Sequence, residues 1–107
     1  MPRGLILPCL LIACALAACG PALPEPNSAD VARAEARFGP ANLAQLQEGR
    51  RLYLARCGSC HALREPRSLE PDAWLAQVHD MRVNKGAHIS ATEETRIDEY
   101  LVSVSSR

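Results

Sequence analysis

The sequence predicts an all-α protein, and two observations support that prediction. Apolar residues recur at three- and four-residue spacing in three segments of the chain, as expected for helices that each bury one face. No segment alternates apolar and polar residues with a period of two, so the signals of β-strands are absent. The 107 residues suffice for one small domain.

The first helical segment covers residues 42–56, NLAQLQEGRRLYLAR. Leu43, Leu46 and Tyr53 share one stripe of this helix, and Gly49 lies on the same stripe. We expect that stripe to face the core.

The middle segment covers residues 72–82 and begins with Asp72, which gives an acidic first turn. Trp74, Val78 and Met81 follow at positions i, i+4 and i+7, so they share a single face.

The last segment covers residues 91–103, with Ser90 or Thr92 as the N-cap and glutamates in the first turn. Its expected buried stripe consists of Ile97, Tyr100, Leu101 and Val104.

The first 18 residues have the layout of a secretory signal peptide. Arg3 supplies a basic charge, an apolar run extends from Leu5 to Ala18, and small residues precede a cysteine. The run is short for a membrane span and no charged stop-transfer sequence follows it, which disfavours the alternative of a permanent transmembrane anchor.

The end of this segment, Leu16-Ala17-Ala18-Cys19, resembles the lipobox of bacterial lipoproteins, in which the cysteine receives diacylglycerol and becomes the first mature residue. The stretch that ends at Cys14 fits the same loose pattern, but cleavage there would leave an apolar stub on the mature chain. Cleavage before Cys19 is followed by a polar, proline-rich stretch, so we expect Cys19 to carry the lipid. Each buried methylene of the acyl chains would contribute about 0.8 kcal/mol to membrane binding.

The chain is therefore expected to have three parts: a signal peptide (residues 1–18), a lipid-anchored flexible tether (19–41) and a helical domain (42–107). The tether contains one segment that could be helical, residues 30–38, and the Gly39-Pro40 pair ends it. Loss of Arg3 with the signal leaves 11 of the 12 basic residues against 12 acidic ones. Because no basic run with interleaved aromatic residues is present, nucleic acid is not an expected partner.

Two of the five cysteines, Cys57 and Cys60, would remain in the mature domain, and His61 follows directly. Cys57-Gly58-Ser59-Cys60-His61 is the CxxCH pattern by which c-type haem is attached. Two intervening residues on a helical turn bring the thiols to the separation of the haem vinyl groups, and the histidine then points at the iron from the same side. A haem would also complete a core that three short helices with few aromatic residues cannot fill alone.

Three other uses of these residues remain open. A thioredoxin-like redox pair expects a βαβ context, which the chain lacks. A zinc site could combine Cys57 and Cys60 with two of the three histidines, His61, His79 and His88, although adjacent residues rarely bind one ion. A simple disulfide would need no histidine.

Residues 42–104 resemble a small class I-type monohaem cytochrome c. The matching segments are GRRLYLARCGSCH, WLAQVHDMR and GAHISATEETRIDEYL. The resemblance implies a compact fold of three to four helices around one covalently attached haem c. It also implies a close crossing of the first and last helices, for which the candidate pairs are Gly49 with Tyr100 and Tyr53 with Leu101.

Haem iron that carries electrons normally has two protein ligands, so the resemblance implies a second ligand besides His61. Met81 is the only methionine left after processing, and it shares a helix face with Trp74. The other candidates are His88 above all, then His79 and Lys85. On one helix, His79 points about 140° away from Trp74, so both cannot face the haem.

The resemblance and the chemistry of neighbouring residues suggest further contacts. Trp74 would pack on the haem edge or bond a propionate, or would only fill the core. Arg64 and Arg67 could pair with propionates or with an acidic partner, or could be merely solvated. The resemblance also implies a loop proline whose neighbouring backbone carbonyl lies near the N–H of His61. This proline would be Pro66 or Pro71.

The resemblance implies single-electron transfer and not catalysis, because a six-coordinate haem has no open position and no acid–base pair or nucleophile accompanies it. We expect a periplasm-facing carrier that is held by its lipid and exchanges electrons with periplasmic or membrane redox proteins, without a small-molecule substrate. Gly20 after Cys19 favours the outer membrane. The alternatives are a cytochrome subunit of a periplasmic dehydrogenase complex, similar to those of sulfite-dehydrogenase-like systems, and a haem-based sensor with a displaceable distal ligand.

Overall fold

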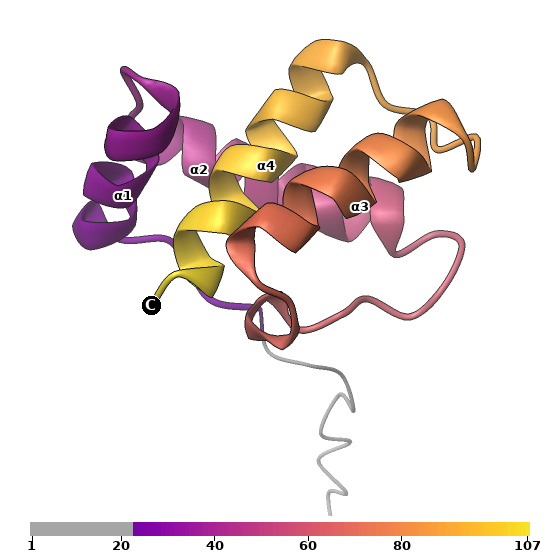
Figure 1. Ribbon diagram of the computed structural model, residues 1–107, viewed down its shortest axis with the longest axis horizontal. Coiled ribbons are helices and arrows are strands. Elements are labelled where there is room, and N and C mark those ends of the chain that lie inside the picture. Colours follow the sequence, from indigo (N-terminus) through magenta and orange to yellow (C-terminus); the bar gives the residue numbers. More distant parts are fainter. Residues whose placement is uncertain (1–22) are drawn as a thin grey trace, which may run out of the picture.

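The computed structural model describes residues 23–107, and every regular element in that range is helical. The α-helices of this range are α1 (Ser28–Phe38), α2 (Leu43–Leu52), α3 (Pro71–Val83) and α4 (Ala91–Ser105) (Figure 1). A π-helical turn, η1 (Tyr53–Cys57), extends α2, and a 3-10 turn, η2 (Pro66–Ser68), precedes α3. The all-α prediction is therefore confirmed for this part of the chain.

The helix starts have clear local causes. The side chain of Asn42 accepts a hydrogen bond from the backbone of Gln45, and Ser90 does the same for Glu93; in both cases the glutamine or glutamate reciprocates. These capping boxes satisfy backbone N–H groups that have no partner within the helix. The N-cap of the last helix is therefore Ser90 and not Thr92. Helix α3 starts with Pro71, whose fixed φ angle and missing N–H suit the first helical position.

Helix α4 is the central element, since it packs against α1, α2, α3 and η2. The four residues of its predicted stripe are all fully buried: Ile97, Tyr100, Leu101 and Val104. They form one core with residues from α2, η1 and α3, namely Leu52, Tyr53, Trp74 and Val78. The predicted faces of the last two helices are thus the faces that the fold buries.

Helices α2 and α4 approach so closely at Gly49 that a larger residue would not fit. A Cβ atom added at this glycine would lie 2.0 Å from the carbonyl oxygen of Arg96 and 2.8 Å from the Cβ atom of Tyr100. The close crossing expected from the resemblance therefore occurs, and the pair that makes it is Gly49 with Tyr100. The predicted stripe of α2 is shorter than expected, because Leu43 is 40% exposed and burial begins at Leu46.

The segment before α2 differs from the expected flexible tether. Leu23 is 8% exposed and belongs to the core, and α1 packs against α4. The carbonyl oxygens of Pro24 and Leu23 accept hydrogen bonds from the Tyr100 hydroxyl, at 2.7 Å, and from Arg50, at 3.2 Å. Residues 23–41 therefore pack against the helices of the domain expected to span residues 42–107.

A buried carboxylate fastens α1 to the end of the chain. Asp30 has no exposed surface, and its carboxyl oxygens lie 2.6 Å from the guanidinium groups of Arg33 and Arg107. Burial raises the pKa of Asp30, but the hydrogen bonds from Arg107 and Arg33 outweigh that effect, so the pKa is lowered overall. Such a charge is stable in the interior only because it is paired.

The predicted signal peptide and the predicted lipid-carrying Cys19 lie outside the described residues. Between residues 23 and 107, none of the helices combines the length and the apolar character needed to cross a bilayer.

Candidate cofactor site

One cavity of about 260 Å³ opens between η1, the loop that follows it and α3. Its walls are mainly apolar. All five predicted cofactor-binding residues line it: Cys57, Cys60, His61, Trp74 and Met81. The chain therefore brings together two thiols, an imidazole and a thioether that are up to 24 positions apart in sequence.

The π-helical turn η1 leads the chain from α2 into the attachment motif. Cys57 ends this turn, and both Tyr53 and Cys57 border the cavity. A π-turn is energetically unfavourable and is frequent at functional sites. The sequence offered no signal for it, because the apolar spacing of residues 42–56 is that of an ordinary helix.

The two thiols differ in environment. Cys57 is half-buried and Cys60 is exposed, and neither forms a disulfide. Burial, and then the charge of neighbouring Cys60, raise the pKa of the Cys57 thiol. The Cys57 thiol is thus harder to deprotonate than an ordinary cysteine.

His61 is exposed, and its Nδ1 atom lies 2.9 Å from the carbonyl oxygen of Ala62. The interaction expected with a loop proline is not made. The carbonyl of Pro66 instead accepts a hydrogen bond of 2.7 Å from the indole N–H of Trp74, and Pro71 begins α3. The orientation of the imidazole is therefore set by its immediate neighbour in sequence.

Trp74 and Tyr53 hold the loop that follows the attachment motif. Their rings meet edge to face with centroids 5.8 Å apart, and Trp74 is 2% exposed. The Tyr53 hydroxyl donates a hydrogen bond of 2.6 Å to the carbonyl of Arg64, next to the bond from Trp74 to Pro66. Burial, and then the charge of Cys57, raise the pKa of Tyr53 to about 12, so this hydroxyl remains a donor at neutral pH. The indole N–H of Trp74 is occupied in this way, so it is not free to bond a propionate.

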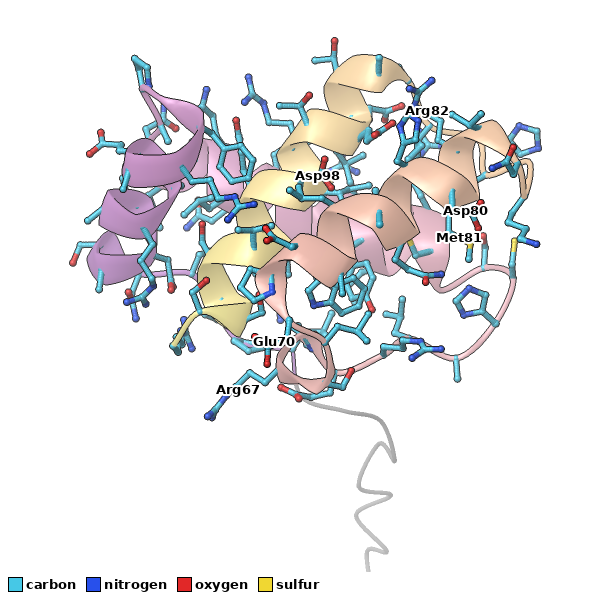
Figure 2. The ribbon with its side chains drawn as sticks, viewed as in Figure 1. Arg67, Glu70, Asp80, Met81, Arg82 and Asp98 are labelled. Atoms are coloured by element: carbon cyan, nitrogen blue, oxygen red, sulfur yellow. The ribbon has the colours of Figure 1, made fainter. Side chains whose placement is uncertain are left out.

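Met81 is half-buried near the C-terminal end of α3, between Asp80 and Arg82 (Figure 2). Of the other ligand candidates, Lys85 lines the cavity, whereas His79 and His88 do not. His79 is 2.9 Å from Glu94, which also pairs with Arg82. The predicted separation of Met81 and His79 onto different faces of α3 is thus observed.

Basic side chains stand at the cavity. Arg56, Arg64 and Lys85 line it, while Arg67, the other predicted arginine, does not. Arg56 also lies 3.6 Å from Glu93. Sequence reasoning missed Arg56, although it directly precedes Cys57.

The residues present suit a c-type haem better than the alternatives weighed from the sequence. The cavity is apolar and is lined by Cys57, Cys60, His61 and Met81, whose thiol, imidazole and thioether groups are of the kinds that attach and ligate a c-type haem. The proposed zinc set is not assembled, because His61 is the only histidine of residues 23–107 at the cavity. Within that range no three His, Cys, Asp or Glu side chains gather as a metal-binding group.

Comparison of the chain with protein-family models, with curated proteins and with solved structures finds no match.

Proposed function

We propose that this protein carries single electrons on one haem c, attached through Cys57 and Cys60 and ligated axially by His61 and Met81. A bound haem would supply one centre that alternates between the ferric and ferrous states. A methionine sulfur as the second axial ligand favours the ferrous state and raises the potential.

One observation carries the proposal: the four residues needed for attachment and ligation of a haem, Cys57, Cys60, His61 and Met81, line the same apolar cavity. The chain's own residues would then have distinct tasks. His61 and Met81 would ligate the haem iron, while Trp74 and Val78 would help to keep water from the cavity. Arg56, Arg64 and Lys85 supply positive charge for carboxylate groups at its edge.

Anchoring and partners belong to the same proposal. We infer that Cys19 carries the lipid and that the domain faces the periplasm, with the outer membrane favoured. Its partners would be redox proteins, and no small-molecule substrate is expected. We infer that the domain carries electrons and is not an enzyme in its own right.

Absorption spectroscopy tests the ligand set. Wild type, Met81→Ala, Lys85→Ala and His88→Ala are produced in a periplasm with haem-attachment machinery and recorded in ferric, ferrous and ferrous-plus-carbon-monoxide states. Lys85 borders the cavity and His88 does not, so the two variants form a matched pair of controls.

Wild type should show covalent low-spin haem with the weak far-red sulfur-to-iron band, and Met81→Ala should lose that band and bind carbon monoxide readily. Both control variants should resemble wild type. A spectrum that changes with Lys85 or His88 instead of Met81 would assign the second axial ligand to that residue. A protein without attached haem would contradict the proposal altogether.

A further inference from the structure

The segment that leads into α1 is fixed to the domain a few residues after the proposed lipid site. Cys19 and Leu23 are four positions apart, and a fully extended chain spans at most about 3.5 Å per residue, or about 14 Å here. Leu23 is already buried in the core. We infer that the folded domain sits directly on the membrane surface, with the face at Leu23 toward the lipid; this rests on the proposed lipidation of Cys19.

The attachment of this segment is firm. Besides burying Leu23 and Pro26, it accepts hydrogen bonds from Arg50 and from the Tyr100 hydroxyl. The side chain of Arg50 also lies 3.2 Å from Glu25. These contacts reach both α2 and α4, so the whole helical core follows the position of the anchor.

The face toward the lipid can be defined from the surroundings of Leu23. The end of the chain belongs to it, because Arg107 donates a hydrogen bond of 2.8 Å to the carbonyl of Glu25. The turn η2 packs on α4, and in the view of Figure 1 it lies at the same edge of the domain as the point where the described chain begins. Figure 2 shows Arg67 and Glu70 on this side.

This face carries charges of both signs. Glu25 and Glu70 are exposed, as are Arg67 and Arg107. A surface of mixed charge has little preference for anionic lipids. The orientation should therefore be set by the short covalent link and depend little on lipid charge or salt.

The short link also restricts the redox partner. A domain of this size has a radius of gyration of about 12 Å and therefore a diameter of about 30 Å, so with a link of about 14 Å every part of it lies within about 45 Å of the bilayer. A link of about 14 Å is too short for the domain to turn over. Met81, which lines the cavity, lies in Figure 2 on a different side of the domain from Arg67 and Glu70, so the cavity would not face the lipid. The partner that fits is a redox protein embedded in or bound to the same membrane.

Paramagnetic broadening of backbone NMR signals tests this orientation. The full mature chain, in its reduced state, is placed on uncharged phosphatidylcholine nanodiscs that carry a gadolinium-chelating lipid headgroup. Mass spectrometry reports the lipid on Cys19 and an absorption spectrum reports the haem, both on the same sample.

Amides of residues 23–28, 67–70 and 105–107 should lose most of their signal, while those of residues 84–94 should keep theirs. Insertion of a flexible segment of twelve residues, alternating glycine and serine, between Ala22 and Leu23 should abolish this difference in signal loss between the two groups of amides. The same insertion after Arg107 is the matched control and should leave it unchanged.

Even broadening over the whole domain of lipidated wild-type protein would overturn the inference while the haem spectrum leaves the proposed function intact. A contrast that survives the N-terminal insertion would also overturn it, because the lipid contact would then not depend on the short link. A chain without lipid on Cys19 would remove the basis of the inference.

Discussion

The close contact at Gly49 makes this residue the most demanding position in the core. Gly49→Ala would place a Cβ atom 2.0 Å from the Arg96 carbonyl oxygen, and only a shift of α2 against α4 can relieve that overlap. We expect the free energy of unfolding to fall by about 3 kcal/mol. Urea unfolding measures this loss, with Ala44→Ser at an exposed position of α2 as the control. A change below that of the control would mean that the two helices do not cross here.

Asp98 makes stability depend on pH between the acidic and the neutral range. Burial first, and then the charge of Glu94, raise the pKa of this carboxyl to about 7, although His79 lowers it, and its Oδ1 atom has no hydrogen-bond partner among residues 23–107. The folded protein therefore binds more protons than the unfolded chain between about pH 4 and pH 7, and stability falls as pH rises through that window.

Asp98→Asn should remove this dependence. Because the carboxyl is partly exposed, solvent screening reduces the effect, and we expect a gain of about 1 kcal/mol at pH 8 and little change at pH 4. Urea midpoints at both pH values test this, with Glu35→Gln on an exposed face of α1 as a control of equal charge change. An equal gain at both pH values would contradict the assignment.

At the scale of elements, the loop between the attachment motif and α3 depends on two aromatic donors. Trp74→Phe keeps the ring in the core but leaves the buried Pro66 carbonyl without the bond that it now accepts. We expect a loss of about 2 kcal/mol in stability and faster amide exchange in residues 62–69. Tyr53→Phe removes the neighbouring bond to Arg64 and should loosen the same loop. Faster exchange across the whole domain would indicate instead that Trp74 acts only through the core.

Helices with a regular stripe of apolar residues could be predicted from the sequence, but contacts between residues far apart in the sequence could not. The buried stripe of α4 and the faces of α3 follow from apolar spacing alone. Helix α1 has an alanine- and arginine-rich sequence in which Asp30 and Ala34 are buried, and the Asp30 carboxylate meets Arg107, 77 positions later. No local pattern encodes that pair.

The same division applies to the candidate site. CxxCH is a local motif, and the spacing of Trp74, Val78 and Met81 indicates which side of α3 faces the cavity. The loop contacts differ, because Tyr53 and Trp74 could have met any carbonyl of residues 62–70. The path of that loop decides which carbonyl oxygen each side chain bonds. The positions of the prolines in the sequence do not predict this path.

At the scale of the whole molecule, the N-terminal segment is part of the fold. Leu23 fills a site in the core and contributes about 2 kcal/mol by its burial, and α1 adds the paired carboxylate of Asp30. Without this segment the Tyr100 hydroxyl and the Arg107 guanidinium would lose the partners that they bond here. A domain defined as residues 42–107 would thus lack the contacts that residues 23–41 make with its core.

Truncation tests this view of the domain. A chain that begins at Asn42 should be less stable than one that begins at Leu23 by on the order of 4 kcal/mol, since it loses apolar burial and leaves buried polar groups unpaired. A third chain from Leu23 with Asp30→Asn and Leu23→Ala should fall between the two. Urea unfolding of all three chains, matured in the same periplasm, measures the order of their stabilities. Equal midpoints for the chains from Leu23 and from Asn42 would mean that residues 23–41 are a tether after all, and the domain would then be free to move away from its anchor.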